Sequence, residues 1–231
     1  MSEEISKLQL VIDKLLSNKK GIRALEAGCG SSSHIDMGKE VYLVGIDISE
    51  KQLQKNSILN EKILGDIQNY DFSASEFDII VCWEVLEHVL QPKKAIENLI
   101  KTLKNDGILI LAIPNIFSIK GILTKYTPHW FHVWVYKNLF GYKLAGKEGQ
   151  LPFRTILRFS IAPKFIKQFA HDNNLSIEYC SIYECQKQKN IRKNKFFNII
   201  LNAIIFLIKI LSIKKIDANL TDYIIVLKKN N

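Results

Sequence analysis

Short apolar runs alternate with helix-like segments along this chain, and the alternation constrains the fold more than any other feature of the sequence. The runs that predict strands cover residues 22–27, 41–48, 62–64, 77–83, 108–113, 176–184 and 222–227. The segments that predict helices cover residues 5–16, 50–60, 91–104 and 163–174. Strands that alternate with helices form parallel sheets covered on both faces, so the chain predicts a doubly wound α/β fold.

Two segments interrupt this alternation. Residues 116–160 are rich in aromatic side chains and are expected to cover the edge of the sheet at which the parallel strands end. Residues 186–216 are basic at first and then apolar. A chain of 231 residues with 47% apolar residues can bury one sizeable core. Residues 1–231 are therefore predicted to form a single domain that carries both insertions.

The cysteine spacing predicts a reducing compartment. The four cysteines are Cys29, Cys82, Cys180 and Cys185, and none of them forms a CxxC pair. This spacing argues against a disulfide framework and against a structural zinc site. Residues 1–20 are polar and amphipathic, unlike a signal peptide. We therefore expect a cytoplasmic protein.

The formal net charge of +9 is concentrated near the C-terminus. Residues 186–231 contain ten basic and two acidic residues, whereas residues 1–185 contain 22 basic and 21 acidic ones. Of the 32 basic residues 28 are lysines, and surfaces that read bases depend on the bidentate arginine side chain. The charge pattern argues against nucleic acid as a partner.

A loop of small residues, 28–33, follows the first predicted strand. Gly28 and Gly30 allow a ligand to approach the backbone closely, and Asp47 ends the second predicted strand. A carboxylate at that place can accept hydrogen bonds from a ribose diol. Folds that bind nicotinamide cofactors and folds that bind S-adenosylmethionine share this arrangement, and a purely structural turn is the remaining alternative.

Further motifs accompany this loop. The run Glu26-Ala27-Gly28-Cys29-Gly30 begins it, Gly65-Asp66-Ile67 follows the third predicted strand, and residues 103–109 lead into the fifth. In this combination and order the motifs, together with strand 77–83, resemble those of the class I S-adenosylmethionine-dependent methyltransferases over residues 20–115. Ser32 departs from the pattern, because many members have a third glycine there. The resemblance implies a Rossmann-like, mostly parallel seven-stranded sheet with an antiparallel last strand.

The resemblance also implies roles for individual residues. The backbone of the glycine loop would support the methionine part of the cofactor, and Glu26 would orient its amino group. Asp47 would hold the ribose and Asp66 the adenine amino group, while Trp83 and Glu84 would border the sulfonium. The implied cofactor-binding residues are Glu26, Gly28, Cys29, Gly30, Asp47, Ile48, Asp66, Ile67, Trp83 and Glu84.

Glu84, Glu87 and His88 come directly after the fourth predicted strand. If a helix begins there, their side chains project from one face, because positions i, i+3 and i+4 align. Two carboxylates and an imidazole could then hold a divalent cation such as Mg²⁺. A packing role without metal is the alternative, and His88 could instead be a general base.

His129 and His132 lie in the aromatic run 128–136, where the resembling family usually builds its acceptor pocket. A neutral histidine can take a proton from an acceptor hydroxyl near pH 7. The predicted catalytic residues are therefore His129, His132 and His88, and His132 could also complete the shell of the cation. Packed aromatic residues with incidental histidines are the alternative.

The segment 187–213 combines a basic flank with an apolar helix. Five basic residues lie between 187 and 195, and the four polar residues of 196–213 fall on one narrow helical stripe. The segment is too short to span a bilayer easily and contains a lysine. A helix of this kind can lie on an anionic membrane surface, and an oligomer contact or a core helix are the alternatives.

These features together predict an S-adenosylmethionine-dependent methyltransferase that O-methylates a small or lipid-linked acceptor at the inner face of a membrane. One alternative is a metal-dependent methyltransferase that acts on RNA ribose 2′-hydroxyls. A second is a scaffold that binds the cofactor without catalysis.

Overall fold

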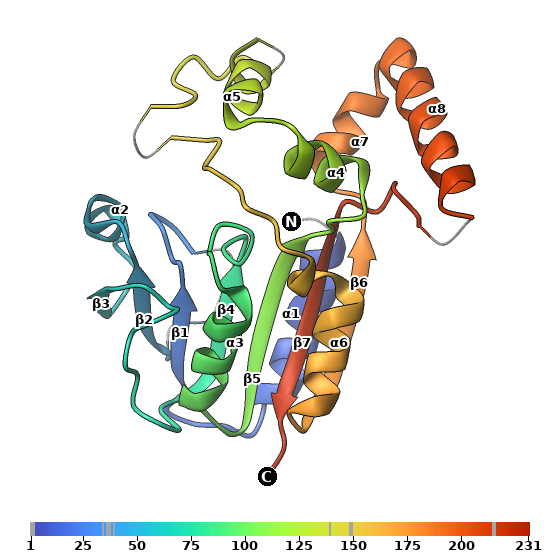
Figure 1. The fold of residues 1–231 in the computed structure, drawn as a ribbon. Helices are drawn as coiled ribbons and strands as arrows, with labels where there is room; N and C mark the ends of the chain where they lie inside the picture. Colours follow the sequence, from blue (N-terminus) through green and yellow to red (C-terminus); the bar gives the residue numbers. More distant parts are fainter. Residues whose placement is uncertain are drawn as a thin grey trace.

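The computed structural model describes residues 3–33, 35, 38, 40–138, 140–147, 150–213 and 216–231. Its centre is a seven-stranded sheet with the strand order β3-β2-β1-β4-β5-β7-β6 (Figure 1). The strands are β1 (Arg23–Ala27), β2 (Tyr42–Asp47), β3 (Glu61–Leu64), β4 (Phe77–Trp83), β5 (Leu103–Pro114), β6 (Leu175–Tyr183) and β7 (Asp222–Lys229). Strands β1 to β5 pair in parallel, and β7 runs antiparallel between β5 and β6. The predicted α/β sheet with its antiparallel last strand is confirmed.

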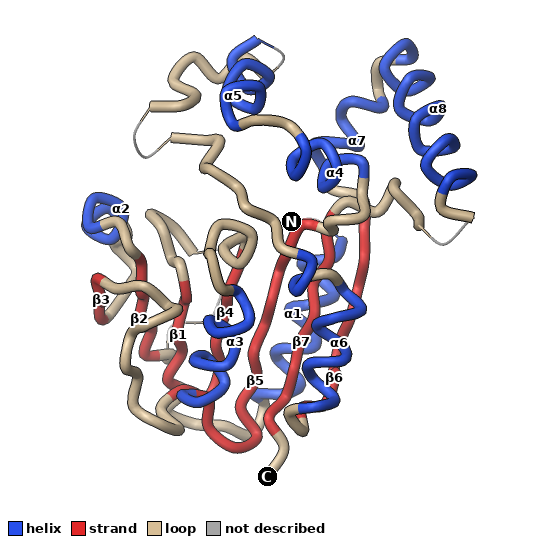
Figure 2. Tube along the Cα trace, viewed as in Figure 1, coloured by secondary structure: helices blue, strands red, loops and turns tan. Residues whose placement is uncertain are grey.

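Helices cover both faces of this sheet (Figure 2). α3 (Pro92–Thr102), α6 (Pro163–Asp172) and a short 3-10 helix (Phe159–Ile161) lie on one face, and α1 (Glu3–Leu16) lies on the other. Each face has its own apolar core cluster, with Leu99 and Ile166 in the first and Leu8 and Ile12 in the second. The helical periodicity of these segments is therefore explained by burial of one stripe on each helix.

Strand β4 shows why the central strands have continuously apolar sequences. Its first six residues are all buried. Ile80 and Cys82 belong to the cluster beneath α3 and α6, whereas Ile79 and Val81 belong to the cluster beneath α1. Because neighbouring side chains point to opposite faces, a strand that is covered on both faces needs apolar residues along most of its length, and the exception in β4, Asp78, pairs with Lys104 at 2.8 Å.

Helix α2 (Glu50–Lys55) is shorter than the predicted segment 50–60. The Asn56 side chain turns inward and is 1% exposed, and its Nδ2 lies 3.5 Å from the carbonyl oxygens of Cys29 and Gly30. Asn60 accepts a hydrogen bond from the Leu43 amide at 2.7 Å. Residues 56–60 are thus held against the glycine loop and β2, and this contact ends the helix.

The two insertions, 116–160 and 186–216, form a helical cap beyond the carboxyl ends of the parallel strands (Figure 1). The first contributes α4 (Ile119–Tyr126) and α5 (His129–Asn138), and the second contributes α7 (Gln186–Arg192) and α8 (Lys195–Leu211). Among the described residues no single helix is long and apolar enough to cross a membrane. In the described part of the chain one pair of helices, α7 and α8, meets those criteria when taken together, and this pair is bent by 116°.

Candidate active site

The candidate site lies at the edge of the sheet where β1, β2 and β4 end. Ala27, the last residue of β1, pairs with Ile46 of β2 on one side and with Cys82 of β4 on the other. The chain therefore leaves all three strands at the same edge. This register brings together the glycine loop, Asp47 and the turn after β4, as the sequence predicts.

The glycine loop is anchored to β2 through its backbone. The Gly28 and Cys29 amides both donate to the Ile46 carbonyl oxygen, at 2.8 and 3.1 Å. Gly28 has φ +74°, and a Cβ atom at this position would lie 2.3 Å from a methyl group of Val85. No side chain fits between the loop and Val85, so the loop backbone itself forms the surface of the site.

Asp47 links the loop to the end of β2. One carboxylate oxygen accepts from the Gly30 amide at 2.9 Å, and the other accepts from the Ser49 amide at 2.8 Å. An ionised carboxylate has about four acceptor positions, so two remain available. The half-buried Asp47 side chain can therefore accept hydrogen bonds from both hydroxyls of a ribose while it holds the loop.

Glu26 before the loop and Cys29 within it are both buried. Glu26 is 3% exposed and accepts a hydrogen bond from the Ser33 hydroxyl. Its buried carboxylate fits a cationic amino group. Burial, with Asp47 and Glu26 nearby, raises the pKa of the Cys29 thiol to about 12. Cys29 therefore stays a neutral thiol, and its contribution to the site is its backbone amide.

The predicted adenine region lies at the ends of β2 and β3. The Gly65 amide donates to the Asp47 carbonyl oxygen at 3.0 Å, which ties the two strand ends together. The Asp66 carboxylate accepts from the Gln68 amide at 2.8 Å and from the Gln68 side chain. Ile48 is 76% exposed and Ile67 is buried. An exposed isoleucine beside an oriented carboxylate fits a flat heteroaromatic ring with an amino group, so the residues present fit S-adenosylmethionine.

The helix on which the predicted cation site depends does not begin directly after β4. The Glu84 amide still donates to the Ala112 carbonyl oxygen of β5, at 2.9 Å, and Glu84 has φ +52°. The chain thus continues the strand pairing of Trp83 and then reverses in a turn over residues 84–88. The next helix, α3, begins only at Pro92. Glu84, Glu87 and His88 therefore do not share a helical face.

Without a helix at residues 84–88, the three proposed ligands of the cation have no common face. Glu84 is exposed, whereas Glu87 is 3% exposed. His88 Nδ1 lies 2.8 Å from the Arg154 carbonyl oxygen, and its Nε2 is 3.9 Å from the Glu87 carboxylate. Within the described ranges of the chain no three histidine, cysteine, aspartate or glutamate residues gather in a way that could hold a metal ion.

His129 and His132 are paired within the cap. Their ring centroids are 6.2 Å apart, and His132 Nε2 shares a hydrogen bond of 2.7 Å with the Thr127 hydroxyl. Burial, together with His129, lowers the pKa of His132. Figure 1 shows α5 well beyond the end of β4, so the structure does not bring these histidines to the glycine loop. Their catalytic role stays a prediction.

The sequence analysis missed the segment 153–158, which crosses the turn after β4. The amides of Ile156 and Leu157 donate to the Glu87 carbonyl oxygen at 2.8 and 3.1 Å. His88 bonds the same segment through Arg154, and its ring contacts Phe153 edge-on at 6.1 Å. The aromatic insertion is thereby held directly over the turn that borders the site. No sequence signal marks this contact, because backbone groups make most of it.

A partly buried ion pair between α4 and the start of β7 was also missed. Lys120 on α4 lies 2.7 Å from the carboxylate of Asp222, which is 5% exposed. Burial opposes the charge of Lys120, but the Asp222 carboxylate more than offsets it and raises the pKa of Lys120. Thr221 donates to the second oxygen of Asp222 at 2.8 Å. Since Asp222 pairs with Pro114 across β5 and β7, this ion pair fixes the point at which the first insertion leaves the sheet.

Glu87 predicts a measurable pH dependence of stability. Its Oε2 atom is buried without a hydrogen-bond partner, and burial raises the pKa of Glu87 to about 8. In the unfolded chain the carboxyl ionises near its ordinary value of 4.5. Between these values the folded state binds the extra proton, so the free energy of unfolding falls as pH rises. We expect the Glu87 contribution to fall by about 2 kcal/mol between pH 5.5 and 7.5.

Urea unfolding of the wild type and of Glu87→Gln at several pH values measures this slope. The variant should lose less stability than the wild type as pH rises from 5.5 to 7.5. The exposed Glu97→Gln variant on α3 is the matched control and should keep the wild-type slope. Identical slopes in wild type and Glu87→Gln would show that the Glu87 carboxyl is ionised in the folded protein.

Comparisons with known proteins point to one family. A family model described as "Methyltransferase domain" matches residues 2–158. An uncharacterized protein of Methanocaldococcus jannaschii is 34% identical over 113 residues, which are 49% of this chain and 48% of that protein. The mitochondrial ubiquinone biosynthesis O-methyltransferase of Schizosaccharomyces pombe is 32% identical over 104 residues, which are 40% of this chain and 38% of that protein. The chain thus matches about half, or less, of the length of these relatives.

Solved structures share the fold. The YcgJ protein of Bacillus subtilis has a TM-score of 0.61 at 13% identity, and the match covers 98% of this chain and 99% of that one. A SAM-dependent methyltransferase of Archaeoglobus fulgidus has a TM-score of 0.55 at 13% identity, over 97% and 94% of the two chains. At these identities the likeness supports the architecture, and the Rossmann-like fold is confirmed.

Proposed function

The chain belongs to the methyltransferase-domain family, and from this premise we propose that it is an S-adenosylmethionine-dependent enzyme that methylates a hydroxyl group of a small-molecule acceptor. The observation that carries the proposal is Asp47, whose carboxylate holds the Gly30 amide and keeps two acceptor positions free for a ribose. Two relatives are named as O-methyltransferases of ubiquinone biosynthesis, and these names support a small acceptor with a hydroxyl group.

The chain's own residues would bind and orient the reactants. S-adenosylmethionine, when bound, supplies a methyl group on a positively charged sulfur. Asp47 would fix the ribose, the Glu26 carboxylate would fix the amino group, and the backbone at Gly28 would set the depth of binding. Rate enhancement would then follow from alignment of the acceptor oxygen with the methyl carbon at the edge where β1 and β4 end.

Of the three histidines predicted as bases, His88 has the arrangement that best suits proton transfer. Its Nδ1 lies 2.8 Å from a backbone carbonyl oxygen and must donate to it, which leaves Nε2 as the acceptor. Burial lowers the pKa of His88, so the ring is neutral near pH 7. During methyl transfer the acceptor hydroxyl would give its proton to Nε2 of His88.

The proposal further places the enzyme on a membrane surface through α8, with a lipid-linked acceptor. α8 has no buried residue, and Asn198 and Asn202 face α7, since Arg192 donates to them at 2.8 and 2.6 Å. Surface helices of globular proteins normally bury their apolar stripe, whereas α8 leaves most of its apolar side chains exposed. The exposed apolar side chains are Phe196, Phe197, Ile199, Ile200, Ile204, Phe206, Leu207, Ile210, Leu211 and Ile213.

A cytoplasmic location at the inner leaflet is consistent with two features. All four cysteines are free thiols. The basic residues before α8 suit the anionic lipids of that leaflet, which attract each nearby lysine or arginine by about 1 kcal/mol. A lipid-linked acceptor would then be presented at the surface on which the enzyme lies.

Two measurements on the wild type test this function. Calorimetric titration with S-adenosylhomocysteine should give a micromolar dissociation constant, about −8 kcal/mol. Transfer of a radiolabelled methyl group should then be found on amphiphilic phenols presented in vesicles. Binding without transfer to any acceptor would identify a scaffold, transfer to RNA alone would identify a ribose methyltransferase, and a folded protein that binds no cofactor would contradict the proposal altogether.

A further inference from the structure

The net positive charge is concentrated in the cap far more strongly than the overall charge suggests. Residues 116–160 contain seven basic residues and one acidic residue, and residues 186–216 contain eight basic residues and no acidic one. The cap therefore carries a formal charge of +14, whereas the remainder of the chain carries −5. Both insertions, which lie far apart in the sequence, contribute to one strongly positive end of the molecule.

Helix α5 has the same unusual surface as α8. None of its ten residues is buried. Trp130 is 69% and Trp134 is 49% exposed, and Tyr126 at the end of α4 is 72% exposed. The rings contact one another instead of a core, since Phe131 stacks on Trp134 with centroids 6.1 Å apart. Large aromatic residues in this number on one exposed segment mark an interaction surface.

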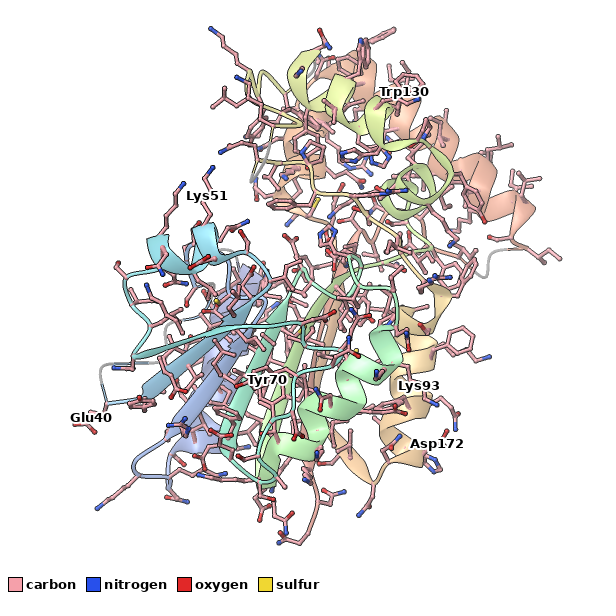
Figure 3. The ribbon with its side chains drawn as sticks, turned by 60° about the vertical axis from the view of Figure 1, so that its left-hand side comes forward. Glu40, Lys51, Tyr70, Lys93, Trp130 and Asp172 are labelled. Carbon is pink, nitrogen blue, oxygen red and sulfur yellow. The ribbon has the colours of Figure 1, made fainter. Side chains whose placement is uncertain are left out.

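The two insertions contact each other within the cap. The Lys187 amino group of α7 donates to the Tyr136 hydroxyl of α5 at 3.3 Å and lies 5.4 Å from the centre of that ring. Figures 1 and 3 both show α5 and α8 at the end of the molecule that lies beyond the strands. Trp130 in Figure 3 lies at the far side of the cap, away from the sheet.

We propose that α5 is a second lipid-binding element, so that Trp130 and Trp134 enter the same anionic membrane surface as α8 and both insertions dock as one cap. The inference rests on the membrane surface proposed above for α8. The chemistry of the cap selects lipid as the occupant. Tryptophan and tyrosine prefer the headgroup region of a bilayer, where the ring is apolar on one side and hydrated on the other.

The charge of the cap completes this match. An amphipathic surface with a positive charge binds anionic bilayers, and the acidic remainder of the chain would be repelled from the same surface. The molecule would therefore dock with the cap toward the lipid and the sheet away from it. RNA is a poorer match, because only three of the fifteen basic cap residues are arginines and the rings of α5 already contact one another, with Trp130 edge-on to Phe131 and Phe131 stacked on Trp134.

Tryptophan fluorescence tests the inference directly. The chain has three tryptophans, Trp83 at the end of β4 and two on α5. Vesicles that contain anionic lipids with brominated acyl chains should shift the emission of the wild type to shorter wavelength and quench it. Trp130→Phe/Trp134→Phe should lose most of the quenching. Trp130→Ala/Trp134→Ala should bind these vesicles at least about tenfold more weakly.

The matched control is Phe165→Ala, which removes an exposed aromatic side chain from α6 on the body of the protein and should leave vesicle binding unchanged. Co-sedimentation without quenching would show that α8 docks alone, which would overturn this inference and leave the proposed function intact. Absence of co-sedimentation would overturn both membrane claims. The inference would also be overturned if the wild-type protein bound single-stranded RNA as tightly as it binds anionic vesicles.

Discussion

Replacing Asp47 with alanine is expected to weaken S-adenosylhomocysteine binding by about 100-fold or more. A hydrogen bond to an ionised group contributes about 1.5–3 kcal/mol, and the ribose would lose two of them. The glycine loop would also lose the acceptor of the Gly30 amide at 2.9 Å. Calorimetric titration of the wild type and the variant measures the loss, and thermal unfolding of both shows that the variant is folded.

Two further variants separate the ribose contact from the loop contact. Glu50→Ala removes an exposed carboxylate from the first turn of α2, three residues after Asp47, and should bind like the wild type. Asp47→Asn keeps an oxygen for the Gly30 amide but loses the charge, and its affinity should fall between those of the wild type and Asp47→Ala. If Asp47→Ala keeps micromolar affinity, Asp47 does not hold the ribose.

The sheet and the position of the glycine loop beside Asp47 were predictable because both depend on strand order and on local chemistry. In β4 the nearly continuous apolar run follows from burial on both faces, and this run is visible in the sequence. Gly28 is required where Val85 leaves no room for a Cβ atom. Asp47 lies near the loop because it ends β2, which pairs in parallel with β1. Each of these features is local in sequence or is set by the sheet.

The features that sequence reasoning missed depend on contacts between distant segments. The turn at Glu84 forms because its amide still pairs with β5, and the helical spacing of Glu84, Glu87 and His88 carries no information about that bond. Helix α2 ends because Asn56 turns toward the glycine loop. Neither contact has a periodic signature, so neither could be found from one sequence.

The charge of the cap is not visible when the charged residues are counted over segments that differ from the two insertions. Division of the chain at residue 185 hid the basic insertion 116–160 among the acidic residues of the sheet and its helices. The structure places this insertion beside residues 186–216 through Tyr136 and Lys187, and the two segments then have to be counted together. The sequence also contained the polar stripe of α8, but only the bonds from Arg192 show that Asn198 and Asn202 of this stripe face α7.

Neutralising the basic flank of α8 is the second change with a large expected effect. Lys189, Lys193 and Lys195 are exposed, and Lys189→Gln/Lys193→Gln/Lys195→Gln should weaken binding to anionic vesicles about 150-fold. The reason is that each lysine near such a surface contributes about 1 kcal/mol, and about 1.4 kcal/mol changes an equilibrium tenfold. Co-sedimentation at low salt measures the partition. High salt should also weaken the binding of the wild type to anionic vesicles, because it screens exposed charges.

The control for this variant has to match its net charge. Lys93→Gln/Lys164→Gln/Lys167→Gln removes three exposed lysines from α3 and α6 on the body of the protein and should bind vesicles like the wild type. If both triple variants lose binding equally, only the total charge matters and α8 does not mark the docking surface. If the α8 variant binds neutral vesicles as well as the wild type does while losing anionic ones, the apolar face and the basic flank contribute separately. That separation is expected, since the apolar side chains of α8 point outward whether or not its lysines are charged.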